Sequence, residues 1–359
     1  MKTIVALGGE GIGPEVVDAT CELLVASGMP LMVVTPPHGA AALATHGSPL
    51  PDETKRACET ADGVLFGAAG AAPSSAVVTW LRWAKGTFAS VRPVKHYPGA
   101  SSPLARPDGI NYVIIRELSE GLYPGREGDL ADLARAMPEL KDKVGTRVSD
   151  YGPGRFAAKV VTRAGVERVA KFSCELARTR KARGGRGKLT CITKSNVLPQ
   201  SDGLFQQIVA DMVKRDYPDL THEHFYVDDG ARRLVRFPQQ MDVVLTMNLY
   251  GDILSDLGAE TAGGLGMAPS GCFRDGWAYF ESVHGSAPDI AGRGIANPTG
   301  TLLSAAMMLD HMGLTAEAQR LDAAVARVYR DGKTLTADQG GKASTKEFEH
   351  AVLEAYRNQ

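Results

Sequence analysis

Short apolar segments alternate with helical segments along this chain, and this alternation limits its fold more than any other feature. Apolar runs typical of buried strands occupy residues 3–7, 33–34, 63–66, 91–95, 112–115, 189–193 and 243–247. Residues 15–26, 52–60, 166–181, 299–312 and 316–329 have the pattern of helices. Strands separated by helices predict an α/β fold with a large parallel or mixed sheet covered on both faces.

The size of the chain indicates more than one domain. A chain of 359 residues exceeds what one hydrophobic core usually organises. Its 44% hydrophobic and 23% charged residues are typical of a globular protein. Residues 143–162 are rich in Gly, Tyr, Val and Arg without a helical period, which predicts strands or an extended arm.

The cysteines and the N-terminus indicate a cytoplasmic location. The five cysteines are odd in number, scattered and without CxxC spacing, which favours reduced thiols over disulfides or a zinc site. The apolar run at residues 3–7 is too short for a signal peptide. No segment approaches the roughly 20 apolar residues of a membrane span, so we expect no membrane association.

Two aspartates, Asp252 and Asp256, lie four residues apart in an otherwise apolar helical stretch. Residues i and i+4 share a helix face, so two carboxylates would lie side by side. A divalent cation such as Mg²⁺ or Mn²⁺ would relieve their repulsion, because these ions prefer oxygen ligands. Acidic residues favoured by the helix dipole are the plainer alternative. Asp228, at the end of an expected strand, is a candidate third ligand.

Polar residues at strand ends suggest a site for an acidic substrate. Arginine at the end of a buried strand suits the bidentate binding of carboxylates. Arg116 closes an expected strand, Arg92 lies in another strand before Pro93, and Arg82 follows a helical stretch. Together they indicate a substrate with two or more carboxylates, although structural ion pairs are an alternative for each. Lys194 could act as a base and Tyr123 as a proton donor, and the alternatives are a solvated lysine and a packed loop tyrosine.

Two loops have the composition of a nucleotide site. The glycine-rich turn at residues 8–15 lies between a strand and a helix, where backbone amides can approach an anion, but it lacks GxGxxG spacing. Residues 281–298 form a long segment rich in Gly, Pro and polar residues, and ordered loops of this length usually bind something.

The basic run at residues 178–188 raises the alternative of nucleic-acid binding. No aromatic residues interleave with it, and the net charge of the chain is −1. A solvated helix end explains the run better, and we expect no nucleic-acid partner.

Together these motifs resemble the isocitrate/isopropylmalate dehydrogenases, the β-decarboxylating dehydrogenases that act on isocitrate, homoisocitrate, 3-isopropylmalate and D-malate or tartrate. The resemblance runs nearly end to end and is most specific at residues 248–256 and 284–298. It implies the two-domain isopropylmalate dehydrogenase-like fold and not a Rossmann fold. Residues 1–87 and 263–359 would form a large NAD-binding domain, and residues 88–262 a small domain with the arm and a homodimer interface.

The resemblance also implies roles for individual residues. Arg82, Arg92 and Arg116 would bind the substrate carboxylates, Tyr123 would donate a proton, and Lys194 would be the base. Asp228, Asp252 and Asp256 would bind Mg²⁺ or Mn²⁺, with Lys194 and Asp228 supplied by the partner subunit, where Asp228 would also contact substrate. The NAD site would comprise Ile12, Glu281, His284, Gly285, Ser286, Ala287, Asp289 and Asn297. A carboxylate at Asp289 would accept hydrogen bonds from the ribose 2′-OH and repel a 2′-phosphate, which favours NAD over NADP.

The segment before Arg82 departs from both best-known patterns of the family. Isocitrate enzymes have Ser and Asn where Ala76 and Val78 stand, so a third carboxylate would lose its polar partners. Isopropylmalate enzymes have a Leu pair where Val78 and Thr79 stand. The resemblance therefore implies a 3-substituted D-malate with an apolar C3 group. D-malate, tartrate, homoisocitrate or isocitrate as substrate, and a non-catalytic regulatory subunit, are the alternatives.

Overall fold

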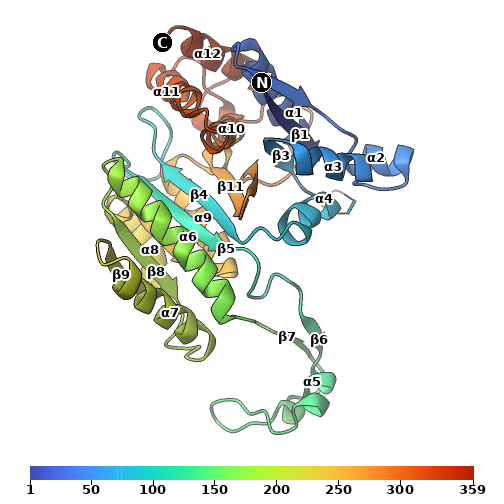
Figure 1. The fold of residues 1–359 in the computed structure, drawn as a ribbon, viewed down its shortest axis with the longest axis vertical. Helices are drawn as coiled ribbons and strands as arrows, with labels where there is room; N and C mark the ends of the chain where they lie inside the picture. The colour runs from blue at the N-terminus through green and yellow to red at the C-terminus, as the bar shows by residue number, and fades with distance from the viewer. Residues whose placement is uncertain (71, 74) are drawn as a thin grey trace.

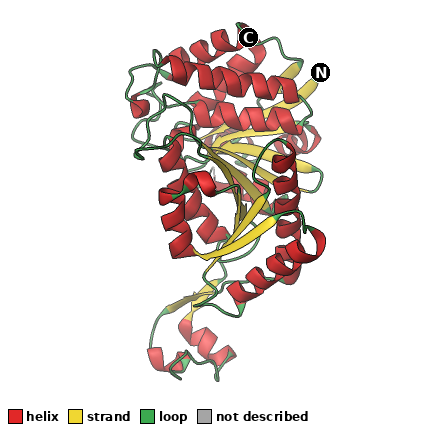
Figure 2. Ribbon diagram, turned by 90° about the vertical axis from the view of Figure 1, so that its left-hand side faces the viewer, coloured by secondary structure: helices red, strands yellow, loops and turns green. Residues whose placement is uncertain are grey.

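A single mixed sheet of ten strands runs through the molecule, as the sequence predicts. Its strand order is β2-β1-β3-β12-β11-β4-β5-β10-β8-β9. The strands pair in parallel on both sides of a central part in which β12, β11, β4 and β5 are antiparallel neighbours. This order differs from that of a Rossmann sheet. The computed structural model describes residues 1–70, 72–73 and 75–359, and helices flank the sheet on both sides (Figures 1 and 2).

The strands are short and for the most part apolar. They are β1 (Lys2–Gly9), β2 (Leu31–Val34), β3 (Gly63–Ala68), β4 (Ala89–Lys95), β5 (Asn111–Glu117), β8 (Lys188–Thr193), β9 (Thr221–Tyr226), β10 (Val243–Thr246), β11 (Pro269–Arg274) and β12 (Trp277–Ser282). The sequence analysis expected a strand ending near Asp228, which is β9, but did not predict β11 or β12.

The helices cover the sheet and its ends. They are α1 (Gly13–Ala26), α2 (Gly39–His46), α3 (Asp52–Thr60), α4 (Ser75–Thr79), α6 (Arg163–Ala182), α7 (Ser201–Asp216), α8 (Val227–Arg236), α9 (Asn248–Ala262), α10 (Thr299–His311), α11 (Thr315–Asp331) and α12 (Thr345–Arg357). A π-helical turn, Trp80–Ala84, follows α4. The predicted helices over 15–26, 52–60, 166–181, 299–312 and 316–329 are present within a few residues.

Two large hydrophobic clusters lie along the sheet. One packs α1, α10, α11 and α12 against β1, β3 and β12, near both chain termini (Figure 1). The other packs α6 and α7 against β4, β5, β8 and β10. Two large clusters agree with the expectation that a chain of this length exceeds what one hydrophobic core organises. The domain boundaries at residues 88 and 262 stay a prediction.

A narrow projection extends from the lower half of the molecule (Figure 1). It contains a separate two-stranded sheet of β6 (Glu127–Asp129) and β7 (Arg155–Ala157), with α5 (Leu130–Ala136) between them. Within residues 143–162, where strands or an arm are expected, the structure has a 3-10 helix (Val148–Tyr151) and β7. Among the described residues, no helix is long and apolar enough to cross a bilayer.

Candidate active site

The alternation of side chains along β5 explains how the site forms. Val113 and Ile115 pack in the cluster with α6 and α7, whereas Tyr112 and Ile114 pack with α8 and α9. Because successive residues of a strand point to opposite faces, Arg116 follows Tyr112 and Ile114 onto the α9 side. There its Nε donates to Asn248 Oδ1 at 2.9 Å, in the first turn of α9.

Asp252 is the point at which several candidate residues meet. Arg92, on the neighbouring strand β4, donates from Nη1 to Asp252 Oδ1 at 3.1 Å and to Ser255 Oγ at 2.6 Å. Arg116 donates from Nη1 to the same Asp252 oxygen, and the Tyr123 hydroxyl donates to Oδ2. The structure therefore brings together four residues that the sequence analysis selected.

The charges in this group shift its pKa values in opposite directions. Burial alone would raise the pKa of Asp252, but the guanidinium groups of Arg116 and Arg92 outweigh it and hold that pKa below its usual value. Burial and the hydrogen bond to Asp252 raise the pKa of Tyr123. Burial and the nearby Arg92 lower the pKa of Arg116 to about 10. At neutral pH the phenol therefore keeps its proton.

Asp256 lies on the same face of α9 as Asp252. Its Oδ1 is 3.7 Å from Arg92 Nη1, so one guanidinium contacts both carboxylates. Burial, together with repulsion from Asp252, raises the pKa of Asp256. Two crowded carboxylates of this kind suit a hard divalent cation. Among the described residues of one chain, however, no group of three His, Cys, Asp or Glu side chains is close enough to hold a metal.

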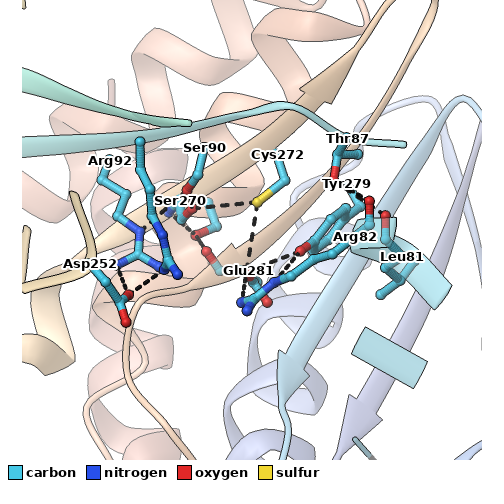
Figure 3. A network of polar contacts seen from close by, with 12 residues as sticks. Leu81, Arg82, Thr87, Ser90, Arg92, Asp252, Ser270, Cys272, Tyr279 and Glu281 are labelled. Atoms are coloured by element: carbon cyan, nitrogen blue, oxygen red, sulfur yellow. Dashed lines mark hydrogen bonds and ion pairs between the residues drawn. The ribbon is translucent and has the colours of Figure 1, made fainter. Parts of the chain in front are cut away.

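Arg82 is held by a second polar group on the other side of the site (Figure 3). Its Nη2 donates to Glu281 Oε1 at 2.8 Å, and its Nε donates to the Tyr279 hydroxyl at 3.1 Å. Burial would lower the pKa of Arg82, but Glu281 raises it well above the usual value. Glu281, expected in the NAD site, thus contacts a residue expected to bind substrate.

Buried side chains on β11 and β4 connect the two arginines. Cys272 Sγ lies 3.7 Å from Glu281 Oε1 and 4.0 Å from Ser270 Oγ (Figure 3). Ser270 Oγ is 3.1 Å from Ser90 Oγ, which accepts from Arg92 Nε at 3.3 Å. This chain of contacts crosses three neighbouring strands and fixes the spacing of Arg82 and Arg92.

A pocket of about 190 Å³ lies between these groups. Its lining includes Arg82, Arg92, Arg116, Asp252, Glu281, His284 and Gly285. Arg116 Nη2 and His284 Nε2 are buried there without a hydrogen-bond partner among the described residues. Burial lowers the pKa of His284. Such unpaired donors and acceptors are uncommon and suit a polar ligand.

Val78 and Thr79 differ in their position relative to the pocket. Val78 lines the pocket together with Ala68 and Ala69 and is partly buried, whereas Thr79 is exposed and lies outside the lining. Ser74, in the same segment, lies outside the described residues. The wall of the pocket before Arg82 is therefore small and apolar.

Lys194 and Asp228 form a pair away from this pocket. Lys194 Nζ donates to Asp228 Oδ1 at 2.5 Å, and this hydrogen bond lowers the pKa of Asp228. The Asp228 side chain is 69% exposed. In the part of the chain that the structure describes, neither residue lines the pocket with Asp252.

The two loops expected at the nucleotide meet beside the pocket. The Ile12 amide donates to the Ser286 carbonyl at 2.9 Å. Gly11 has a φ of 62°, and a Cβ there would lie 1.9 Å from the same carbonyl oxygen, so only glycine fits. Ala287 also has a positive φ, of 41°. Asp289 is exposed.

Asn297 is buried farther along the same loop. Its side-chain amide donates to Asp338 Oδ2 at 2.9 Å and to the Tyr329 hydroxyl at 3.2 Å. Its Oδ1 accepts from the Thr299 amide at 3.0 Å. These contacts connect the loop to the start of α10 and to α11.

Sequence reasoning missed several residues of the site. Tyr279 and Ser255, which hold Arg82 and Arg92, stand 197 and 163 residues away from them in the chain. The sequence could have indicated Ser255 as a site residue, because it lies between Asp252 and Asp256 on the predicted helix. The sequence pattern gave no indication of Tyr279, because β12 was not predicted.

Comparison with known proteins decides the family. The family model "Isocitrate/isopropylmalate dehydrogenase" matches residues 3–352. The chain belongs to this family. It is 42% identical over 359 residues to 3-isopropylmalate/3-methylmalate dehydrogenase of Methanocaldococcus jannaschii, with 100% of both chains covered.

Other relatives carry different substrate names. The isocitrate/homoisocitrate dehydrogenase of Thermus thermophilus is 40% identical over 361 residues, covering 99% of this chain and 98% of that protein. The crystal structure of isocitrate dehydrogenase from Methylococcus capsulatus is similar with a TM-score of 0.86 at 35% identity, covering 99% of this chain and 100% of that chain. The family is thus shared, whereas the named substrates differ.

Proposed function

We propose that this protein catalyses the NAD- and Mg²⁺- or Mn²⁺-dependent oxidative decarboxylation of a 3-substituted D-malate of the 3-isopropylmalate kind. The observation that carries the proposal is the convergence of Arg92, Arg116 and Tyr123 on Asp252, in a pocket that Arg82 also lines. Three guanidinium groups suit a dicarboxylate, and family membership supports the reaction class.

The residues of the chain have distinct tasks in this reaction. Arg82, Arg92 and Arg116 bind and orient the two carboxylates. Lys194 Nζ takes the proton of the C2 hydroxyl, and the Tyr123 hydroxyl, whose raised pKa keeps it protonated, supplies a proton to C3 after CO₂ has left. A bound cation would supply polarisation of the C2 oxygen, and bound NAD would supply the hydride acceptor.

Cation binding requires a second copy of the chain. Asp252 and Asp256 would hold the ion from one subunit, and Asp228 would reach it from the other together with Lys194. The pair of Lys194 with the exposed Asp228, away from the pocket of its own chain, supports such a homodimer. Arg92 and Arg116 donate to Asp252, and substrate carboxylates would compete for these guanidinium groups.

The nucleotide would lie against the two adjoining loops. Ile12, Gly285, Ser286 and Ala287 supply a backbone surface, and the exposed carboxylate of Asp289 favours the ribose hydroxyl of NAD. The buried Nε2 of His284, which has no hydrogen-bond partner within the described residues, would be available to the cofactor. We place the enzyme in the cytoplasm, where its five free cysteines would stay reduced.

The apolar wall around Val78 favours an alkyl group on C3 over a third carboxylate. Purified protein should be supplied with Mg²⁺ and either NAD or NADP, and with 3-isopropylmalate, D-malate, tartrate, homoisocitrate or isocitrate. We expect the highest kcat/KM with 3-isopropylmalate and NAD. A preference for isocitrate or homoisocitrate would contradict the substrate assignment, and no turnover of any of the five would contradict the function.

A further inference from the structure

A second pocket, of about 320 Å³, lies at the C-terminal end of β4, beyond Arg92. It is bounded by Pro93, Val94 and Lys95, by the C-terminal half of α9, and by α10 and α11. It shares no lining residue with the pocket around Asp252 in the described part of the chain. The proposed reaction leaves it without a role.

The floor of this pocket is apolar. Val94, Met267, Leu303 and Ala306 line it and are each less than a tenth exposed. Met307, also in the lining, packs against both large hydrophobic clusters. An alkyl group that covers such side chains removes their apolar surface from water, which favours binding.

The charged groups at its rim are unequally engaged. Both carboxylate oxygens of Asp322 accept hydrogen bonds, at 2.6 Å from Lys95 Nζ and at 2.5 Å from the Tyr97 hydroxyl. Arg183 lies 3.6 Å from Asp310, beyond hydrogen-bonding distance, and its side chain is 62% exposed. The guanidinium of Arg183 thus forms an ion pair with Asp310 but makes no hydrogen bond to the described residues, whereas Asp322 accepts two hydrogen bonds.

Arg183 belongs to the basic run at residues 178–188. A neighbouring hollow contains it together with Arg180 and Arg186. Arg180 donates to Asp242 at 2.7 Å, and Arg186 donates to the Gln239 carbonyl at 3.1 Å. Of these three arginines, Arg183 is the one that also lines the apolar pocket.

We propose that this pocket is a second ligand site, for a small aliphatic monocarboxylate. The alkyl chain would lie on the floor of Val94, Leu303 and Ala306, and the carboxylate would accept hydrogen bonds from Arg183. The volume is at the low end for ligand pockets, which suits a chain of roughly five or six carbons. The proposal does not depend on the function assigned to the active site.

The test measures binding of 4-methylpentanoate to the full-length protein by calorimetry, without NAD or metal. Arg183→Ala should weaken binding roughly tenfold, the effect of losing one charge-assisted contact. Arg186→Ala is the matched control and should bind as wild type does. Acetate, without the alkyl chain, and 4-methylpentanol, without the carboxylate, should each bind at least tenfold more weakly.

A filling variant tests the floor independently of charge. Ala306→Leu should abolish binding while circular dichroism stays that of the wild type, and if it fails to fold, Arg183→Ala still decides, because that side chain is exposed. Binding that survives Arg183→Ala but disappears in Arg116→Ala would place the ligand in the active site and overturn the proposal. No measurable binding to the wild type would also overturn it.

Discussion

Asp252 accepts hydrogen bonds from Arg92, Arg116 and Tyr123, which come from β4, β5 and the loop after β5. The arginines keep its pKa low, so the carboxylate is charged at neutral pH. That charge in turn raises the pKa of Tyr123. Asp252 thus keeps the hydroxyl of Tyr123, the proposed acid, protonated. It also positions Arg92 and Arg116, which are proposed to bind substrate.

Removing the Tyr123 hydroxyl should affect chemistry more than binding. We expect Tyr123→Phe to lower kcat by roughly 100-fold or more, the usual contribution of a general acid, with a much smaller change in KM. The ring keeps its place over the Arg116 guanidinium, 4.5 Å away. Steady-state kinetics measure this, with the exposed Tyr151→Phe as control. Equal losses in both variants would exclude the assigned role.

Close approach of α9 to β5 places Asp252 beside Arg116. A Cβ at Gly251 would lie 2.7 Å from Arg116 Cβ and 3.0 Å from its Cα. The helix can therefore approach the strand this closely only with glycine at this position. The requirement is not visible in the sequence, where Gly251 reads as an ordinary residue between Tyr250 and Asp252.

Gly251→Ala should separate the helix from the strand. We expect a loss of about 1–3 kcal/mol in the free energy of unfolding, as for other overpacked sites, and a large fall in kcat/KM because Asp252 moves with the helix. Gly203→Ala in α7 is the control: a Cβ there meets nothing within 4 Å, so stability should be unchanged or slightly higher. Urea unfolding and kinetics compare the two, and equal effects would refute the packing argument.

Helix α12 contains a buried acid whose pKa predicts a pH dependence. Glu349 is 1% exposed, and its Oε2 has no hydrogen-bond partner among the described residues. Burial raises its pKa. The folded state therefore binds this proton more tightly than the unfolded state does, so the stabilisation is complete below the unfolded pKa and is lost as pH rises through the folded pKa.

Glu349→Gln should remove the loss of stability that the wild type shows as pH rises. We expect the variant to exceed the wild type by about 1 kcal/mol in the free energy of unfolding at pH 8, with the difference shrinking as pH falls toward 4. Exposed Glu354→Gln, on the same helix, should show no such trend. Urea unfolding from pH 4 to 8 measures both, and a difference that grows toward acid pH would contradict the assignment.

At the scale of the molecule, much of the fold is predictable from sequence. Apolar strands such as residues 63–66 and 112–115 need burial on both faces and so specify an α/β sheet. The hairpin of β11 and β12 was missed, because a prediction from local pattern cannot show that Gly271 pairs with both Val91 and Phe280. The Arg82–Glu281 contact joins residues 199 positions apart and was missed for the same reason.

The position of Lys194 and Asp228 predicts active sites shared between two subunits. Lys194→Ala and Tyr123→Phe should each be nearly inactive alone. After denaturation and refolding together, they should recover about a quarter of wild-type activity, because half of the dimers are mixed and each has one intact site. No recovery, although size-exclusion chromatography shows dimers, would mean that each site lies within one chain.

The most direct test of the central claim is the stoichiometry of the reaction. With 3-isopropylmalate, NAD and Mg²⁺, the protein should release one CO₂ for each NADH formed, and a chelator should stop both together. NADH without CO₂, CO₂ without NADH, or turnover that persists in the chelator would contradict an oxidative decarboxylation that depends on a cation at Asp252 and Asp256.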